Sequence, residues 1–129
     1  MLFRSGITKE KDFAILTAEI SKATFGLTPS EYKNVKGLTK KNQNLRDHMT
    51  DLELIFTMLG ERVTTEISQQ EKPEDFEGNK DVARRGGNVA GVARKETEKE
   101  LGHSVISSEN FLNLDEKSNG TLSENNLPE

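Results

Sequence analysis

The strongest helix signal in this chain begins at Thr50. The stretch TDLE at 50–53 has the form of a capping box, in which a threonine caps the first turn and a glutamate reaches back to it. Apolar residues then recur at helical spacing, so we expect a helix from 51 to about 67. Its predicted apolar stripe consists of Leu52, Ile55, Phe56, Leu59, Val63 and Ile67. Leu54 and Met58 flank that stripe, which is typical of a central, buried helix.

Two further helices are expected before this one. Residues 11–25 place apolar side chains at helical spacing and are followed by a glycine that stops the helix. The stretch TPSE at 28–31 is a second capping box with proline at the first helical position, and it predicts a short helix that ends at Gly37. Another short helix is expected from about Lys40 to His48.

The second half of the chain is predicted to contain one more long helix. Residues 69–79 have the composition of a loop, and residues 80–101 have that of a helix, either continuous or interrupted at Gly86-Gly87. Gly102 is the expected cap of that helix. Val105-Ile106 is expected to make a short apolar contact, followed by a last helical turn that buries Phe111 and Leu112.

No segment has strand alternation, so the expected fold class is all-α: a small helical bundle around the central buried helix at about 51–67. The hydrophobic content of 32% indicates a small core. We expect residues 1–10 to be a non-native or flexible start, residues 11–112 to form the helical domain, and residues 113–129 to form a disordered acidic tail.

Several classes of protein are excluded or disfavoured by composition. The chain has no cysteine, which excludes disulfides and thiolate chemistry. No apolar run approaches the roughly 18 residues of a membrane span, and the opening MLFRSG is too short and polar for a signal peptide. A cytoplasmic protein with no membrane partner is therefore expected.

Signals of catalysis are weak. The two histidines, His48 and His103, are not spaced as a metal pair, and we expect no metal and no cofactor. The run GGNVAG at 86–91 has phosphate-loop glycine spacing, but Val92-Ala93 stands where lysine and a hydroxyl residue are needed. An acidic cluster at 71–77 is typical of a solvated loop. The chain is expected not to be an enzyme and to have no small-molecule substrate.

A basic, amide-rich segment stands out in a chain whose net charge is −4. It can be interpreted as a surface that contacts phosphates, because lysine and arginine neutralise a nucleic-acid backbone and amides bond to sugars or base edges. It can equally be a solvated helix face in a charge-rich protein. The candidate residues are Lys33, Lys36, Lys40, Lys41, Asn42, Gln43, Arg46 and His48.

A second basic cluster lies on the last predicted helix. Its two pairs, Arg84-Arg85 and Arg94-Lys95, are ten residues apart, which is about 15 Å along a helix. They could join the first cluster on one face, or they could form ordinary surface pairs with acids that intervene on the same helix. The same helix carries a stripe of small residues that would allow tight helix packing or a dimer contact. That stripe comprises Ala83, Gly87, Ala90 and Gly91.

Several short pieces occur in an order that carries a resemblance. They are Lys36-Gly37-Leu38, Lys41-Asn42-Gln43, Leu45, Asp47-His48-Met49, Glu53-Leu54, the run at 87–95, and Glu100-Leu101-Gly102. Over roughly residues 12–112 this order resembles the C-terminal region of bacterial DNA-damage-inducible protein D, a family associated with BRO and phage antirepressor proteins. The resemblance implies a helical domain without a defined active site, and larger relatives whose N-terminal DNA-linked domain is missing here.

Two functions follow as hypotheses. The resemblance implies a non-enzymatic accessory module of an SOS-type DNA-damage response, acting through a basic surface on DNA or on a DNA-bound recombination or repair protein. The alternative is a protein–protein or dimerisation module of an antirepressor-like protein that does not bind DNA directly. In that case the helix at 51–67 and the small-residue stripe would form the interface of a homodimer.

Overall fold

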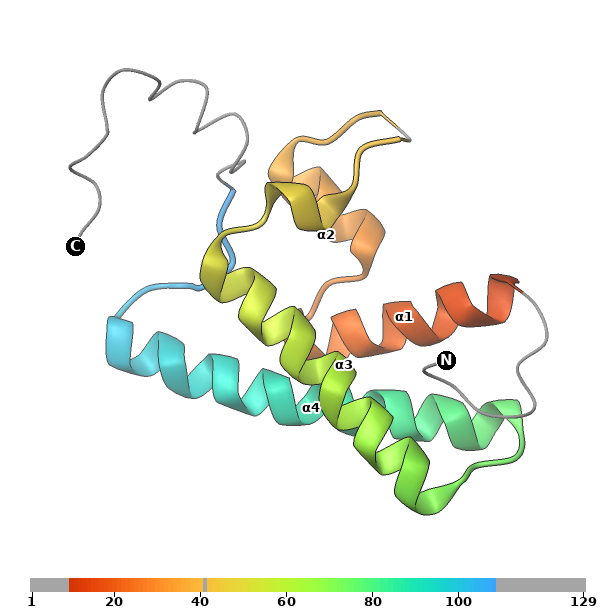
Figure 1. Ribbon diagram of the computed structural model, residues 1–129. Helices are drawn as coiled ribbons and strands as arrows, with labels where there is room; N and C mark the ends of the chain where they lie inside the picture. The colour runs from red at the N-terminus through yellow and green to blue at the C-terminus, as the bar shows by residue number, and fades with distance from the viewer. Residues whose placement is uncertain (1–9, 41, 109–129) are drawn as a thin grey trace, which may run out of the picture.

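The computed structural model describes residues 10–40 and 42–108, and within them the chain is all-α, as predicted. In Figure 1, α3 crosses α4, α1 lies along another side of α4, and α2 with η1 sits above the start of α3. The segment after α4 turns back towards α2. In chain order the elements are α1 (Glu10–Phe25), α2 (Pro29–Lys36), the 3-10 turn η1 (Leu45–His48), α3 (Asp51–Glu71) and α4 (Phe76–Leu101).

Both predicted capping boxes are present. The Thr28 hydroxyl accepts from the Glu31 backbone N–H at 3.2 Å, and the Glu31 carboxylate accepts from the Thr28 N–H at 2.9 Å. Thr50 and Glu53 make the same reciprocal pair at 3.3 and 2.8 Å. Four consecutive residues therefore specify where each of these helices begins, because the caps satisfy N–H groups that the first turn leaves without partners.

The predicted helix from Lys40 to His48 is largely wrong, because only Leu45–His48 is helical, as a short 3-10 turn. Amide side chains bond to the backbone here and compete with helix formation. Gln43 Oε1 accepts from the Lys40 N–H at 2.9 Å, and Asn44 Oδ1 accepts from the Arg46 N–H at 3.0 Å. The amide-rich composition that drew attention to this segment is thus also what keeps it from being an α-helix.

The loop between the two long helices is shorter than the predicted 69–79. Helix α3 continues to Glu71 and ends at Lys72, whose φ of 51° is left-handed. Helix α4 begins at Phe76, because Asp75 caps it by accepting from the Gly78 N–H at 2.7 Å. From there α4 runs without interruption through both central glycines to Leu101.

The central glycines of α4 allow two helices to pack directly against its backbone. A Cβ placed at Gly86 would lie 2.6 Å from Cα of Thr64 in α3, and one placed at Gly87 would lie 2.6 Å from the carbonyl oxygen of Ile20 in α1. Ala83, Gly87, Ala90 and Gly91 are all buried in this way. The small-residue stripe therefore serves packing within the chain, and these four residues are not free to form a dimer contact.

Helix α3 turns a different face inward from the one predicted. Its buried residues are Glu53, Phe56, Gly60, Thr64 and Ser68. Of the predicted apolar stripe only Phe56 is buried, whereas Leu52 and Ile55 are 37% and 52% exposed. Leu59, Val63 and Ile67 are half-buried, so the predicted apolar stripe is only partly buried. The glycine surface of α4 accepts small residues, and the branched side chains of α3 therefore lie on the flank of the contact.

The apolar core falls into two clusters. One joins α1 to α4 through Leu16, Ile20 and Ala83, with Phe13 and Phe76 against them. The other gathers α2, α3 and the segment after α4 around Phe25 and Tyr32, whose rings meet edge to face with centroids 4.9 Å apart. Val105 is buried in the second cluster, which confirms the contact predicted for Val105-Ile106. The predicted turn with Phe111 and Leu112, the tail at 113–129 and residues 1–9 lie outside the described residues.

Replacing Gly86 by alanine tests the close approach of α3 and α4. Alanine gains about 1 kcal/mol of helix propensity over glycine, but overpacking against a backbone atom costs about 1–3 kcal/mol. We expect the cost to exceed the gain, so Gly86→Ala should lower the free energy of unfolding by up to about 2 kcal/mol, measured by urea unfolding followed by circular dichroism.

The matched control for this test is Asn88→Ala, at an exposed position of the same helix. It should leave stability unchanged or slightly raised, because only the propensity term applies there. A Gly86→Ala protein as stable as Asn88→Ala would contradict the close contact.

Candidate functional site

One lysine of the basic segment, Lys36, does not reach the surface. Lys36 Nζ lies 2.6 Å from Glu53 Oε1, and both side chains are fully buried. Lys36 was predicted to contact a nucleic acid or a partner, and that prediction is wrong, because the ammonium is enclosed between α2 and α3. A buried ammonium requires a countercharge in place of water, and Glu53 supplies it.

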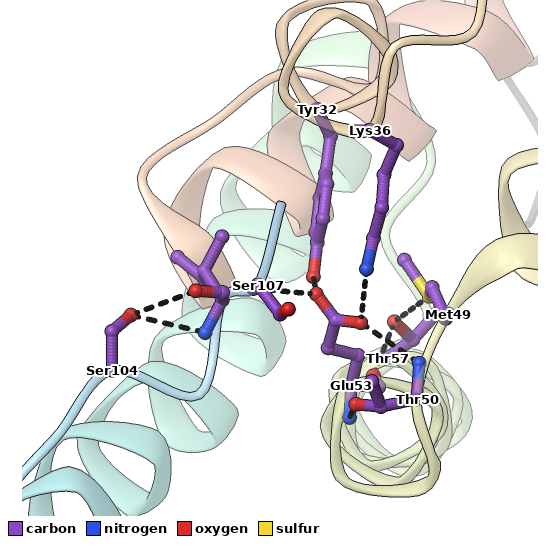
Figure 2. A network of polar contacts seen from close by, with 9 residues as sticks. Tyr32, Lys36, Met49, Thr50, Glu53, Thr57, Ser104 and Ser107 are labelled. Carbon is purple, nitrogen blue, oxygen red and sulfur yellow. Dashed lines mark hydrogen bonds and ion pairs between the residues drawn. The ribbon is translucent and has the colours of Figure 1, made fainter. Parts of the chain in front are cut away.

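Glu53 is the centre of a buried polar network (Figure 2). Its carboxylate accepts hydrogen bonds from the Tyr32 hydroxyl, Lys36 Nζ, the Thr50 N–H at 2.8 Å and the Ser107 N–H at 3.1 Å. These donors come from α2, from the residue that caps α3, and from the segment after α4. The carboxylate that closes the capping box therefore also holds three parts of the chain together.

The network keeps its protons in place at neutral pH. Burial raises the pKa of Glu53, but hydrogen bonds from Lys36, Thr50, Tyr32 and Ser107 outweigh it, and the pKa lies below the ordinary value of 4.5. Burial, together with the hydrogen bond to the Glu53 carboxylate, raises the pKa of Tyr32 far above its usual range. Glu53 is therefore a permanent acceptor and Tyr32 a permanent donor. This describes a structural site rather than an acid–base catalyst.

The other cations of the basic segment are also largely engaged. His48 is buried, and Arg46 forms an ion pair with Glu61 of α3. Lys33 is half-buried and Lys40 is exposed, and neither forms an ion pair with the described residues. Asn42 is exposed and Gln43 is half-buried; Lys41 lies outside the described residues.

The arginines of α4 are engaged as well. Arg94 is buried: its Nε donates to the carbonyl oxygen of Thr24 in α1 at 2.7 Å, and its Nη1 donates to the Glu98 carboxylate at 2.9 Å. Arg84 pairs with Asp81 at 2.5 Å, and Arg85 pairs with Glu71 of α3 at 2.5 Å and with Asp81 at 2.9 Å. Lys95 is exposed and forms no ion pair with the described residues. The two basic clusters are thus largely neutralised by neighbouring carboxylates and do not act as one free electropositive surface.

An exposed apolar surface that the sequence patterns did not predict lies on α3 and α4, and we call it the α3–α4 apolar face. Ile55 and Leu59 lie two residues on either side of Thr57, which faces the space between α3 and α1, so they point about 200° away from it. Val89 likewise lies two residues beyond Gly87, which touches α1. The face therefore flanks the α3–α4 crossing on the side away from α1. Its exposed members are Leu52 and Ile55 of α3 with Val89 and Val92 of α4, and the half-buried Leu59 and Val63 of α3 lie beside them in the helical repeat.

The extent of exposure on this face is large for aliphatic side chains. Ile55, Val89 and Val92 are 52%, 47% and 61% exposed.

The sequence signal that could have predicted this face is the four-residue spacing of Gly60, Thr64 and Ser68 in α3. That spacing repeats the small-residue pattern recognised in α4, and two such stripes pack against each other.

The structure also contains a cavity of about 290 Å³ between α1, α2, η1 and α3.

Across residues 10–40 and 42–108, no three histidine, aspartate or glutamate side chains gather as they would around a metal ion. Over the same residues no helix is both long and apolar enough to traverse a bilayer.

Comparison with known proteins identifies no relative: no family model, no curated protein and no solved structure matches this chain.

The buried Glu53 predicts how stability depends on pH. A carboxyl whose folded-state pKa is lowered adds stability above its unfolded pKa, and this contribution is lost as the pH falls through the folded value. We expect the free energy of unfolding to fall as the pH drops below about 4.5, the ordinary glutamate value. Glu53→Gln should flatten that fall. It should also cost about 3–5 kcal/mol at neutral pH, because it leaves Lys36 buried without a countercharge.

Urea titrations at a series of pH values measure both effects. Glu100→Gln is the matched control, because it removes an exposed carboxylate that forms no ion pair with the described residues. It should keep both the stability and the pH dependence of the parent. Parallel pH profiles for Glu53→Gln and the parent would show that the network does not carry the effect.

Proposed function

We propose that this chain is a non-enzymatic interaction module that associates with a second copy of itself through the α3–α4 apolar face. One observation carries the proposal: α3 buries Phe56 together with small and polar residues, and it leaves the branched side chains of Leu52 and Ile55 in solvent. The buried acid Glu53 is locked in a structural network, so no catalytic role is proposed for it.

Covering the exposed apolar area of this face would favour association. Transfer of apolar surface out of water contributes about 25 cal/mol per Å². A contiguous exposed apolar patch framed by polar residues marks an interaction site in many soluble proteins. Ile55, Val89 and Val92 each keep about half of their surface in water, so covering this face supplies free energy that folding of the single chain leaves unused.

The charges at the margin of the face favour a second copy as the occupant. Arg62 and Glu66 are exposed one turn apart on α3, beside Leu59 and Val63. A two-fold interface brings the same patch of both copies together in opposite directions. Arg62 of each copy can then meet Glu66 of the other, while the aliphatic side chains pack between them. A surface with both signs of charge at its edge is complementary to itself.

The resemblance to the C-terminal region of DNA-damage-inducible protein D suggests the setting of this module. We propose that it works in an SOS-type DNA-damage response in the bacterial cytoplasm, where association brings the partners of a DNA-bound recombination or repair protein together. The position of the module in that response rests on the resemblance, whereas the association surface rests on α3 and α4.

The double variant Ile55→Glu, Val92→Glu tests the proposed dimer. Both positions are exposed, so the helices should remain folded, but two carboxylates per copy would be desolvated in the interface at a cost of several kcal/mol. We expect the parent to sediment as a concentration-dependent dimer in analytical ultracentrifugation and the double variant as a monomer.

Ser30→Glu is the control for the added charge. Ser30 is exposed in the first turn of α2, far from the α3–α4 apolar face in sequence and on a different element. It should leave the dimer intact. A parent that remains monomeric at high concentration would refute self-association through this face.

DNA binding by the remaining part of the basic segment is a second candidate function. The observation that favours it is local: Lys33 and Lys40 have no carboxylate partner among the described residues, and the exposed amide of Asn42 lies nearby in sequence. Two lysines with an amide nearby in sequence form a small electropositive feature that could contact phosphates.

Salt dependence distinguishes this candidate from simple self-association. We expect labelled duplex DNA to bind more weakly as salt rises, with a shallow slope because each phosphate contact contributes about 0.9 to it. Lys33→Glu and Lys40→Glu should each weaken the binding strongly, whereas Lys95→Glu, an equal charge change on α4, should weaken it much less. Fluorescence anisotropy at two salt concentrations measures both, and equal effects of the three substitutions would exclude a local site.

A further inference from the structure

The wall of the cavity between α1, α2, η1 and α3 is apolar over most of its surface. Ile20 and Phe25 of α1 form one wall, and Leu45 and Met49 close it from η1 and the residue that follows it. Its volume is about 290 Å³. From its lining and from the charges at its mouth, we propose that this cavity binds a small anionic amphiphile, with the apolar body inside and the anionic head beside Lys33.

The hydroxyl groups in the wall support an apolar occupant. Ser21 Oγ donates to the carbonyl oxygen of Leu27 at 2.7 Å, and Thr24 Oγ1 donates to that of Gly87 at 3.2 Å. Thr57 Oγ1 donates to the carbonyl oxygen of Glu53 at 2.9 Å. Because these three hydroxyl hydrogens are already used by backbone carbonyl groups, Ser21, Thr24 and Thr57 offer no donor to a polar ligand. A hydrocarbon body loses nothing by entering it.

The mouth of the cavity selects the charge of the head group. Lys33, Arg46 and Glu61 all line the cavity. Arg46 and Glu61 form an ion pair and balance each other. Lys33 is half-buried, forms no ion pair with the described residues and leaves one positive charge in the lining of the cavity. A carboxylate or sulfonate head would complete that pair, whereas an ammonium head would face an uncompensated like charge.

The volume limits the size of the ligand. A dry apolar cavity of about 150 Å³ holds benzene, and ligand pockets begin at about 300 Å³. A cavity of about 290 Å³ therefore suits an eight-carbon chain or a bicyclic aromatic body, and it is too small for a long lipid. The class of ligand is thus a short anionic amphiphile.

This site is separate from the proposed dimer surface. The cavity uses the side of α3 that faces α1, with Thr57 and Glu61, whereas the α3–α4 apolar face lies on the opposite side of α3. Loss of one activity can therefore be observed without loss of the other.

Titration of the full chain with octanoate and with 1-octanol tests the proposal. The two probes share a hydrocarbon body and differ in the head, and binding is followed by isothermal calorimetry and by ¹H–¹⁵N NMR shifts. We expect octanoate to bind at least about fivefold more tightly than 1-octanol, the effect of one partly exposed charge pair. The largest shifts should fall on α1, η1 and α3 residues around the cavity.

Three variants locate the site. Lys33→Met should reduce octanoate affinity to that of 1-octanol and leave 1-octanol unchanged. Thr17→Trp places a large side chain at an exposed position that lines the cavity, and it should abolish binding of both probes. Lys22→Met removes an exposed lysine of the same helix that does not line the cavity, and it should change neither affinity.

Each outcome of these titrations either supports the proposed site or overturns it. A selective loss of octanoate in Lys33→Met together with loss of both probes in Thr17→Trp supports the site. Absence of binding by the parent, equal affinity for both probes, or unchanged binding in Thr17→Trp overturns it. Circular dichroism of each variant confirms the helical fold, so that loss of binding is not mistaken for unfolding.

Discussion

The close approach of α4 to both α1 and α3 is the constraint from which the rest of the structure follows. At Gly86 and Gly87 there is room for backbone but not for a methyl group, because a Cβ at either position would come within 2.6 Å of a neighbouring helix. Only small residues can face such a surface, so α3 presents Gly60 and Thr64 to it. The branched side chains of α3 must then lie on the flanks of the contact. The small core and the exposed α3–α4 apolar face are two consequences of one packing arrangement.

Buried polar contacts also fix how the helices and the segment after α4 pack together. Glu53 closes the cap of α3, neutralises Lys36, and accepts from Tyr32 and Ser107. Arg94 does similar work between α1 and α4 through the carbonyl oxygen of Thr24. In a chain with few large apolar residues, fully satisfied polar networks fix how peripheral segments dock. A packing arrangement that left one of these buried groups without a partner would be destabilised, so the contacts favour a single arrangement of the segments.

The same contacts determine which charged groups remain available for binding. Cations that form a basic segment along the sequence are drawn into separate pairs once the chain is folded: Lys36 and Arg94 are buried, and Arg46 and Arg85 meet carboxylates of α3. Among the candidate cations, Lys33, Lys40 and Lys95 form no ion pair with the described residues, and an apolar surface of α3 and α4 is exposed to solvent. Self-association through that surface, and a short anionic ligand in the cavity on the other side of α3, therefore fit the folded charge distribution better than a broad nucleic-acid contact.

Local signals in the sequence determined the all-α class, the two capping boxes, the left-handed ends at Gly37 and Gly102, and the small-residue stripe of α4. Each of these depends on residues within a few positions of one another. The sequence did not determine which face of α3 is buried, which carboxylate each cation meets, or the presence of the cavity. Those depend on pairs such as Lys36 with Glu53 and Gly86 with Thr64, which are distant along the chain and meet only when the helices pack. The rotation of α3 against the glycines of α4 was decided by tertiary structure, because a backbone contact of that kind excludes bulky side chains whatever their hydrophobicity.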